Sequence, residues 1–240
     1  MSNWFEHGNN SQNSNFKSYH IDLPSFINIK ANLYLFSVNI HAGTDYQATV
    51  YDKDQSRISF SVEDQTLFIK EKDENRKQKN IHLSDIPKLI ITIPNGTSLD
   101  SVKIGNNVSD INLAGFSMRQ LDLYLSAGSL QLTEITVKDR AKVILEAGSL
   151  SISHCKTNLN ATLSAGSVKI EQLRGNNHFE LAAGSLKATT DDDQETEYNL
   201  TTVVGSINYH GHRKLHHFYR EGAGKDYLTV QSAVGSIKII

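Results

Sequence analysis

Apolar and polar residues alternate along most of this chain. The segment Arg57–Val62, for example, reads Arg-Ile-Ser-Phe-Ser-Val, so that every second side chain is apolar. A period of two is typical of a β-strand that buries one face, whereas the helical period of 3.6 residues is hard to find anywhere in the sequence. All three prolines lie before Thr97. The pattern therefore predicts an all-β protein.

A short motif recurs about every twenty residues in the second half of the chain. Four clear copies read Leu-x-Ala-Gly-Ser followed by Leu or Val, and two weaker copies keep Val-Gly-Ser-Ile. A degenerate earlier copy has Ser109 in the position of the glycine. The glycines are spaced 20, 18, 18, 21 and 30 residues apart and are Gly128, Gly148, Gly166, Gly184, Gly205 and Gly235.

Aligning the copies on this glycine produces columns of apolar residues. The apolar columns stand five, three and one residues before the glycine, and two and four residues after it. The column three residues before the glycine contains Leu125, Leu145, Leu163 and Leu181. Because apolar residues flank the glycine at one before and two after, we expect the inward alternation to slip by one residue at a corner. Glycine suits a corner because it accepts positive φ and lets neighbouring backbones approach. The column one before the glycine holds Val108, Ala127, Ala147, Ala165, Ala183, Val204 and Val234.

These columns predict a β-solenoid. A single rung of about twenty residues cannot bury its apolar face alone, but rungs stacked about 4.8 Å apart share one continuous core. We predict a disordered polar tail over 1–20, a β-rich N-terminal part or cap over 21–98, and about seven solenoid rungs over 99–240. Within the N-terminal part, Arg57–Val62 and Thr66–Lys70 are expected to form a hairpin, and Leu89–Ile93 a further strand.

Composition and charge narrow the function classes. The formal net charge of the 240 residues is −2, which gives no electrostatic reason to expect nucleic acid as a partner. No apolar run approaches the roughly 18 residues that membrane insertion needs. The N-terminus lacks the apolar core of a signal peptide, which favours a cytoplasmic location. The single cysteine, Cys155, excludes an internal disulfide and aligns with Ile135 and Leu173, so we expect it in the core.

The Ala-Gly-Ser-Leu ladder, preceded by Leu89-Ile-Ile-Thr-Ile-Pro-Asn-Gly96 and Leu99-Asp-Ser-Val-Lys-Ile104, resembles the bacterial "putative adhesin" family of β-strand repeats. The resemblance covers the chain from about Ile27 to its end. It implies a right-handed β-helix-like fold and a link to the cell envelope, with the cell surface as the alternative location. The family has no established catalytic residues, so the resemblance implies no cofactor.

The longest interval between two glycines of the motif holds a His- and Tyr-rich insertion at about 209–227. Insertions in repeat proteins tend to carry the distinctive surface, so we expect this one to bind a protein or a cell-envelope ligand. The expected surface residues are Tyr209, His212, His216, Phe218, Tyr219 and Tyr227. A metal-binding module is an alternative, with ligands drawn from His210, His212, His216 and His217; His210 and His212 share one side if this segment is a strand.

A carbohydrate-active β-helix enzyme is the other alternative. Glu134 and His154 both stand six residues after a glycine of the motif and are expected to stack on adjacent rungs, although a surface ion pair explains them equally well. The sequence contains no Ser-His-Asp set, phosphate loop or dinucleotide motif in a proper context. We therefore favour a non-catalytic scaffold or binding protein without a cofactor.

The chain ends on an apolar strand, Ile237-Lys-Ile-Ile240. An unpaired last rung would be an open sheet edge. The sequence predicts either that the long insertion covers this edge or that two chains meet there, as a homodimer through the C-terminal rung.

Overall fold

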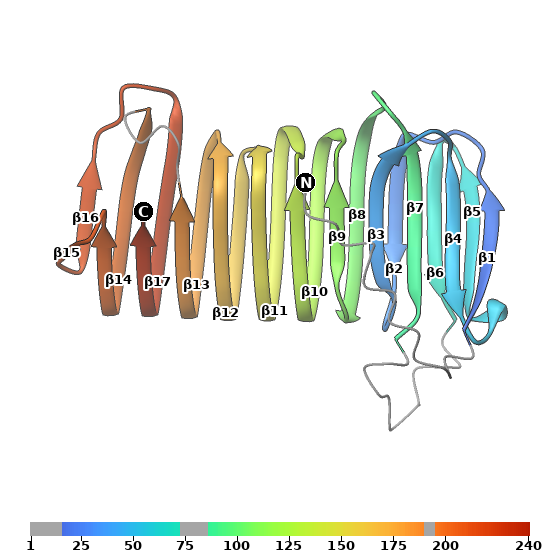
Figure 1. Cartoon of the computed structure of the whole chain (residues 1–240), viewed down its shortest axis with the longest axis horizontal. Helices are drawn as coiled ribbons and strands as arrows, with labels where there is room; N and C mark the ends of the chain where they lie inside the picture. The colour runs from blue at the N-terminus through green and yellow to red at the C-terminus, as the bar shows by residue number, and fades with distance from the viewer. Residues whose placement is uncertain (1–15, 73–85, 190–194) are drawn as a thin grey trace.

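The computed structural model describes residues 16–72, 86–189 and 195–240, so residues 1–15 of the predicted tail lie outside it. The described residues form a long stack of strands with one short 3-10 turn, Gln55–Arg57 (Figure 1). None of them forms a helix long and apolar enough to cross a membrane. The first strands are β1 (Lys17–Asp22), β2 (Asn28–Asn32), β3 (Ser37–Gly43), β4 (Gln47–Asp52), β5 (Ile58–Glu63), β6 (Thr66–Glu71), β7 (Lys88–Pro94), β8 (Ser98–Val108) and β9 (Ile111–Ala114). The remaining strands are β10 (Ser117–Thr133), β11 (Thr136–Lys156), β12 (Leu159–Arg174), β13 (Asn176–Thr189), β14 (Thr196–Tyr209), β15 (His212–Lys214), β16 (His217–Arg220) and β17 (Asp226–Ile239).

The long strands stack in parallel with their repeat motifs in register. Gly128 pairs with Gly148, Gly148 with Gly166, and Gly166 with Gly184. The column of Leu125, Leu145, Leu163 and Leu181 is at most 3% exposed. The prediction of an all-β stack with shared interior columns is confirmed, whereas the right-handed coil and the rung count remain predictions.

The column one residue before each glycine is the exception, because it faces solvent. Val108, Val204 and Val234 are 40%, 59% and 52% exposed, and Ala147, Ala165 and Ala183 are also exposed. The expectation that this column points inward was wrong. The Leu three before the glycine and the aliphatic residue two after it are both buried, so the four residues between them form the outer side of the corner.

The corner glycines have the predicted backbone. Gly148 and Gly166 have φ of 138° and 147°, a region that disfavours side chains. A Cβ built on Gly166 would lie 1.8 Å from the carbonyl oxygen of Gly148 in the rung beside it. Both reasons for glycine at this corner, positive φ and close backbone approach, are confirmed.

A second corner lies six residues further along in four of the rungs. Gly115, Glu134, His154 and Gln172 stand there with φ of 77°, 54°, 54° and 57°. Because non-glycine residues are uncommon in this left-handed region, the column marks a tight turn that the sequence columns did not reveal.

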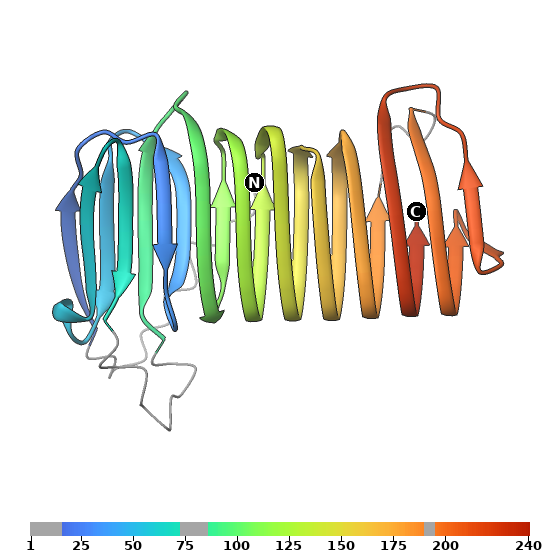
Figure 2. The same ribbon diagram turned by 180° about the vertical axis from the view of Figure 1, so that it is seen from behind.

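The two corners divide the outer surface into two ladders of strands (Figures 1 and 2). The first ladder runs β5, β6, β2, β8 and then the N-terminal halves of the long strands. The second runs β1, β4, β7, β3, β9 and then their C-terminal halves. The antiparallel hairpin of β5 and β6 confirms the predicted one, and β1 begins at Lys17, inside the predicted tail.

A buried ion pair fixes this N-terminal end of the stack. Arg57 Nε lies 3.1 Å from Glu71 Oε1, and the Glu71 side chain is fully buried. The other oxygen of Glu71 accepts hydrogen bonds from the backbone N–H groups of Tyr34 and Leu35 at 2.6 and 3.1 Å. Glu71 thereby joins the hairpin to the loop between β2 and β3.

The order of the last rungs differs from their order along the chain. β17 pairs in parallel with β13 on one side and with β14 on the other, so the C-terminal strand lies inside the stack (Figure 1). The unpaired C-terminal edge expected from the sequence is therefore absent, which removes the reason given for a homodimer through that rung; the homodimer itself remains a prediction. The insertion instead covers β14, with β15 and β16 both antiparallel to it.

Candidate functional site

The predicted binding surface of the insertion is partly an internal cluster. Tyr209 and Phe218 pack against each other, with ring centroids 4.6 Å apart, and Tyr209 also meets the buried ring of Tyr198 at 5.7 Å. Arg220 donates a hydrogen bond of 2.7 Å to the Tyr209 hydroxyl. These two predicted residues therefore hold the insertion onto β14.

The other predicted surface residues are exposed but are spread over both ladders. Tyr219 on β16 is 54% exposed, and Tyr227 on β17 is 41% exposed. Both lie in the first ladder, where β14, with Glu197, separates their strands. His212 lies on β15 in the second ladder, and His216 in the loop between β15 and β16. Desolvation, then the charges of Glu197 and Glu221, raise the pKa of Tyr219. The structure thus brings Tyr219 and Tyr227 near each other, but not the six residues as one site.

The four histidine candidates for a metal site do not converge. His210 and Gly211, with φ of 47° and 81°, form a two-residue turn after which His212 pairs with Tyr209. The expectation that His210 and His212 share one side of a strand therefore fails. His217 contacts the side chain of Asn199 at 3.3 Å. Across the described ranges, no group of three or more His, Cys, Asp or Glu residues is placed to hold a metal ion.

The candidates for covalent or acid–base chemistry have ordinary structural roles. Cys155 is 2% exposed, in register with Leu173, and burial raises the pKa of its thiol; its predicted place in the core is confirmed. Glu134 and His154 share the second corner column, as the stacking prediction requires. The His154 ring contacts Ser153 Oγ at 2.8 Å.

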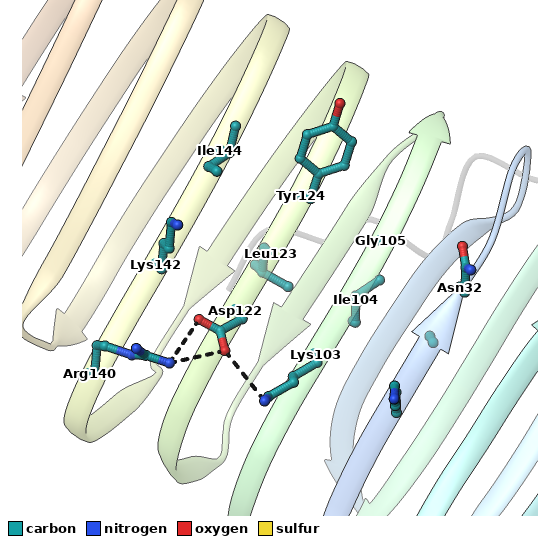
Figure 3. A pocket seen from close by; sticks show the side chains of 12 residues that line it. Asn32, Lys103, Ile104, Gly105, Asp122, Leu123, Tyr124, Arg140, Lys142 and Ile144 are labelled. Atoms are coloured by element: carbon teal, nitrogen blue, oxygen red, sulfur yellow. Dashed lines mark hydrogen bonds and ion pairs between the residues drawn. The ribbon is translucent and has the colours of Figure 1, made fainter.

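A different feature, a hollow on the first ladder, combines shape and charge. It has a volume of about 540 Å³ and crosses four neighbouring strands, β2, β8, β10 and β11 (Figure 3). Its residues are Lys30, Ala31, Asn32, Lys103, Ile104, Gly105, Asp122, Leu123, Tyr124, Arg140, Lys142 and Ile144. It is a shallow depression that is open to solvent rather than an enclosed cavity.

Strand alternation explains why charges gather in this hollow. Lys30 pairs with Lys103, Lys103 with Asp122, and Asp122 with Lys142, so that one row of outward positions crosses all four strands. Asp122 lies between Lys103, at 3.9 Å, and Arg140, at 3.3 Å (Figure 3). Four cations against one carboxylate leave a formal charge of +3 here, on a chain whose formal net charge is −2.

The next row of outward positions forms the other wall of the hollow. It contains Asn32, Gly105, Tyr124 and Ile144, and at Gly105 the wall has a gap because glycine has no side chain (Figure 3). The Tyr124 hydroxyl donates a hydrogen bond to Glu146 and accepts one of 3.2 Å from Ser126 Oγ. The Tyr124 ring is therefore held in place at the edge of the hollow.

Sequence reasoning missed this site because its parts are far apart in the chain. Lys30 belongs to the irregular N-terminal part, and nothing in the repeat predicts that β2 pairs with β8. One signal was present, since Gly105 interrupts an alternating strand outside the corner column.

Comparisons with known proteins agree with the fold. The family model described as Toastrack DUF4097 matches residues 27–140 and 98–240. A "putative adhesin" from Parabacteroides distasonis ATCC 8503 has a TM-score of 0.50 at 13% identity, covering 94% of this chain and 97% of that chain. A "putative adhesin" from Bacteroides fragilis NCTC 9343 has a TM-score of 0.49 at 16% identity, with coverage of 94% and 97%.

A "putative lipid binding protein" from Parabacteroides distasonis ATCC 8503 has a TM-score of 0.36 at 15% identity, covering 95% of this chain and 98% of that chain. No curated protein sequence matches the chain. The resemblance noted in the sequence is confirmed, and because the family model spans residues 27–240, this chain belongs to the Toastrack DUF4097 family.

Proposed function

We propose that this protein is a non-catalytic binding protein that presents its strand ladders to a ligand of the bacterial cell envelope. The observation that carries the proposal is the hollow on the first ladder, where a shaped, positively charged surface lies on rigid, in-register strands. Sites built on strands hold their side chains more accurately than sites built on loops. The family membership, with relatives described as adhesins, supports the same class of function.

Two observations favour binding over catalysis. Cys155 is buried, and its raised pKa disfavours the thiolate that a nucleophile needs. Asp122, the carboxylate in the hollow, is already paired with Lys103 and Arg140. Glycoside hydrolysis normally needs two carboxyl groups facing the same bond, whereas the hollow contains one.

Co-sedimentation with isolated envelope material tests the proposal. The purified protein is incubated separately with insoluble cell-wall polysaccharide and with membrane fragments, and the supernatant is analysed for released saccharides. We expect the protein to sediment with envelope material and to release no fragments. Time-dependent release of fragments would identify an enzyme, and failure to sediment with either fraction would also contradict the proposal.

A further inference from the structure

The hollow on the first ladder carries excess positive charge that ion pairing leaves uncompensated. Lys30 and Lys103 lie directly side by side on β2 and β8, on strands about 4.8 Å apart. Like charges in this arrangement are destabilising. Asp122 pairs with Lys103 and Arg140, while no carboxylate among the described residues pairs with Lys30 or Lys142. A bound anion would relieve this repulsion.

Charge alone does not single out the hollow. Lys169, Lys187 and Lys238 also lie side by side, on the second ladder, where they are exposed. The two rows therefore present similar charge. The wall beside the first row is open at Gly105, whereas the outward positions beside the second row carry the side chains of Ser167 and Ser185, and this difference allows shape to be tested separately from charge.

Gly105 is the second, independent observation. Its backbone is not left-handed, and a Cβ built on it would meet no atom within 4 Å. Neither backbone conformation nor packing therefore requires glycine, although glycine inside a strand weakens it. The absence of a side chain does open the hollow between Asn32 and Tyr124 (Figure 3). A strand glycine of this kind suits a position that a ligand approaches closely.

The chemistry around Gly105 fits a sugar ring that bears acidic groups. Tyr124 provides a fixed aromatic ring, and Asn32 provides an amide that can donate and accept hydrogen bonds to hydroxyl groups. Lys30, Lys103 and Lys142 lie along the adjacent row and provide charge for carboxylate or sulfate groups.

The extent of the site indicates a polymer. Four strands correspond to about 14 Å across the ladder. The same row continues over β12 and β13 with the polar residues Asn160 and His178. A small anion would reach only part of the cationic row, whereas an extended chain can lie along all of it. Among the residues of the hollow, Tyr124 is the one large exposed apolar side chain, against four cationic ones, whereas a helix that inserts into a lipid surface presents a broad apolar face.

We propose that the hollow around Gly105 binds an acidic polysaccharide, which lies across β2, β8, β10 and β11 with its anionic groups on Lys30, Lys103 and Lys142. This inference rests on the proposed binding function and names the chemical class of the ligand.

Calorimetric titration with polygalacturonate tests the charge, with neutral dextran as the control polymer. We expect wild type to bind polygalacturonate and not dextran, and the Lys30→Gln/Lys103→Gln variant to bind it about tenfold more weakly, since two ion pairs are lost. The matched control, Lys169→Gln/Lys187→Gln, removes the same charge from the second ladder. Its affinity should stay within about twofold of wild type.

The variant Gly105→Val tests the shape without changing the charge. Valine favours strands, and its Cβ has room at this position, so the midpoint of denaturant unfolding should stay the same or rise. The valine side chain fills the hollow, and we expect about tenfold weaker binding of polygalacturonate. Unchanged affinity in Gly105→Val would overturn the proposal.

Three further outcomes would contradict the inference. Equal losses in the two double-lysine variants would mean that net charge, not the hollow, attracts the polymer. Binding to phosphatidylglycerol vesicles without binding to polygalacturonate would identify a membrane surface instead. If wild type sediments with envelope material but does not bind polygalacturonate, the acidic polysaccharide is excluded while the general binding function stands.

Discussion

At the residue scale, the corner glycine of each rung from β10 onwards allows neighbouring backbones to approach closely. The space beside each corner glycine is filled by the carbonyl group of the adjacent rung, so the requirement for glycine is steric as well as conformational. At Gly166 an added Cβ would lie 1.8 Å from the Gly148 oxygen, well inside the contact distance of the two atoms.

The substitution Gly166→Ala should therefore destabilise the protein by about 1–3 kcal/mol, because the rungs must separate locally and alanine must take a strained φ. Urea unfolding followed by circular dichroism measures the change. Gly105→Ala is the control: the same substitution in a strand with free space should cost nothing. Equal losses in both variants would contradict the steric explanation.

The two sides of the corner differ in burial, and this difference can be measured. Leu145→Ala removes a side chain that is 0% exposed and should cost about 2–5 kcal/mol of unfolding free energy. Val204→Ser changes a residue that is 59% exposed and should stay within about 0.5 kcal/mol of wild type. A loss above about 2 kcal/mol in Val204→Ser would restore the inward assignment that the sequence suggested.

The same comparison shows what the sequence could predict at this scale. Leucine columns are informative because exposed leucine in every rung would be unusual, and all four leucines are buried. Alanine is small enough for either side of a strand, so its column carried little information. The turn at Glu134 and His154 was missed because the residue type changes from rung to rung in this column, and glutamate does not signal positive φ.

At the element scale, the N-terminal end is held together by one buried carboxylate. Glu71 ends β6 and bonds to Arg57, before β5, and to the backbone of the loop after β2. The hairpin was predictable from alternation and a short turn, but its attachment was not, since a single Glu at a strand end resembles any solvated charge.

Replacing Glu71 with alanine should destabilise the protein by about 3–5 kcal/mol, because Arg57 and two backbone N–H groups would lose their partner in a buried place. Glu63→Ala, an exposed change on the same hairpin, is the matched control and should be nearly neutral. Thermal and urea unfolding of both variants provide the measurement; a neutral Glu71→Ala would mean that the pair contributes no net stability.

At the scale of the whole molecule, the order of the rungs is the feature that departs from the repeat. The sequence predicts consecutive rungs in consecutive places, and β8 to β13 follow that rule. It cannot distinguish β14 from β17 as the neighbour of β13, because Val-Gly-Ser-Ile stands at the same register in both. The hollow could not be predicted for a related reason. It depends on the pairing of β2 with β8, which the repeat does not indicate.

Cysteine cross-linking distinguishes the two rung orders. Thr229 on β17 is in register with His178 on β13 and with Asn199 on β14. We expect His178→Cys/Thr229→Cys to form a disulfide on mild oxidation, and His178→Cys/Asn199→Cys, two strands or about 10 Å apart, to remain reduced. Non-reducing electrophoresis of a proteolytic digest detects the cross-link. A disulfide in His178→Cys/Asn199→Cys but not in His178→Cys/Thr229→Cys would place β14 next to β13.

The position of β17 has a consequence for how the chain assembles. During synthesis, the motif of β14 is made thirty residues before the matching motif of β17, as the spacing of Gly205 and Gly235 shows. For that interval the earlier segment has no competitor for the place beside β13. The native order of the last rungs is therefore complete only after β17, the later of the two segments, has paired with both β13 and β14.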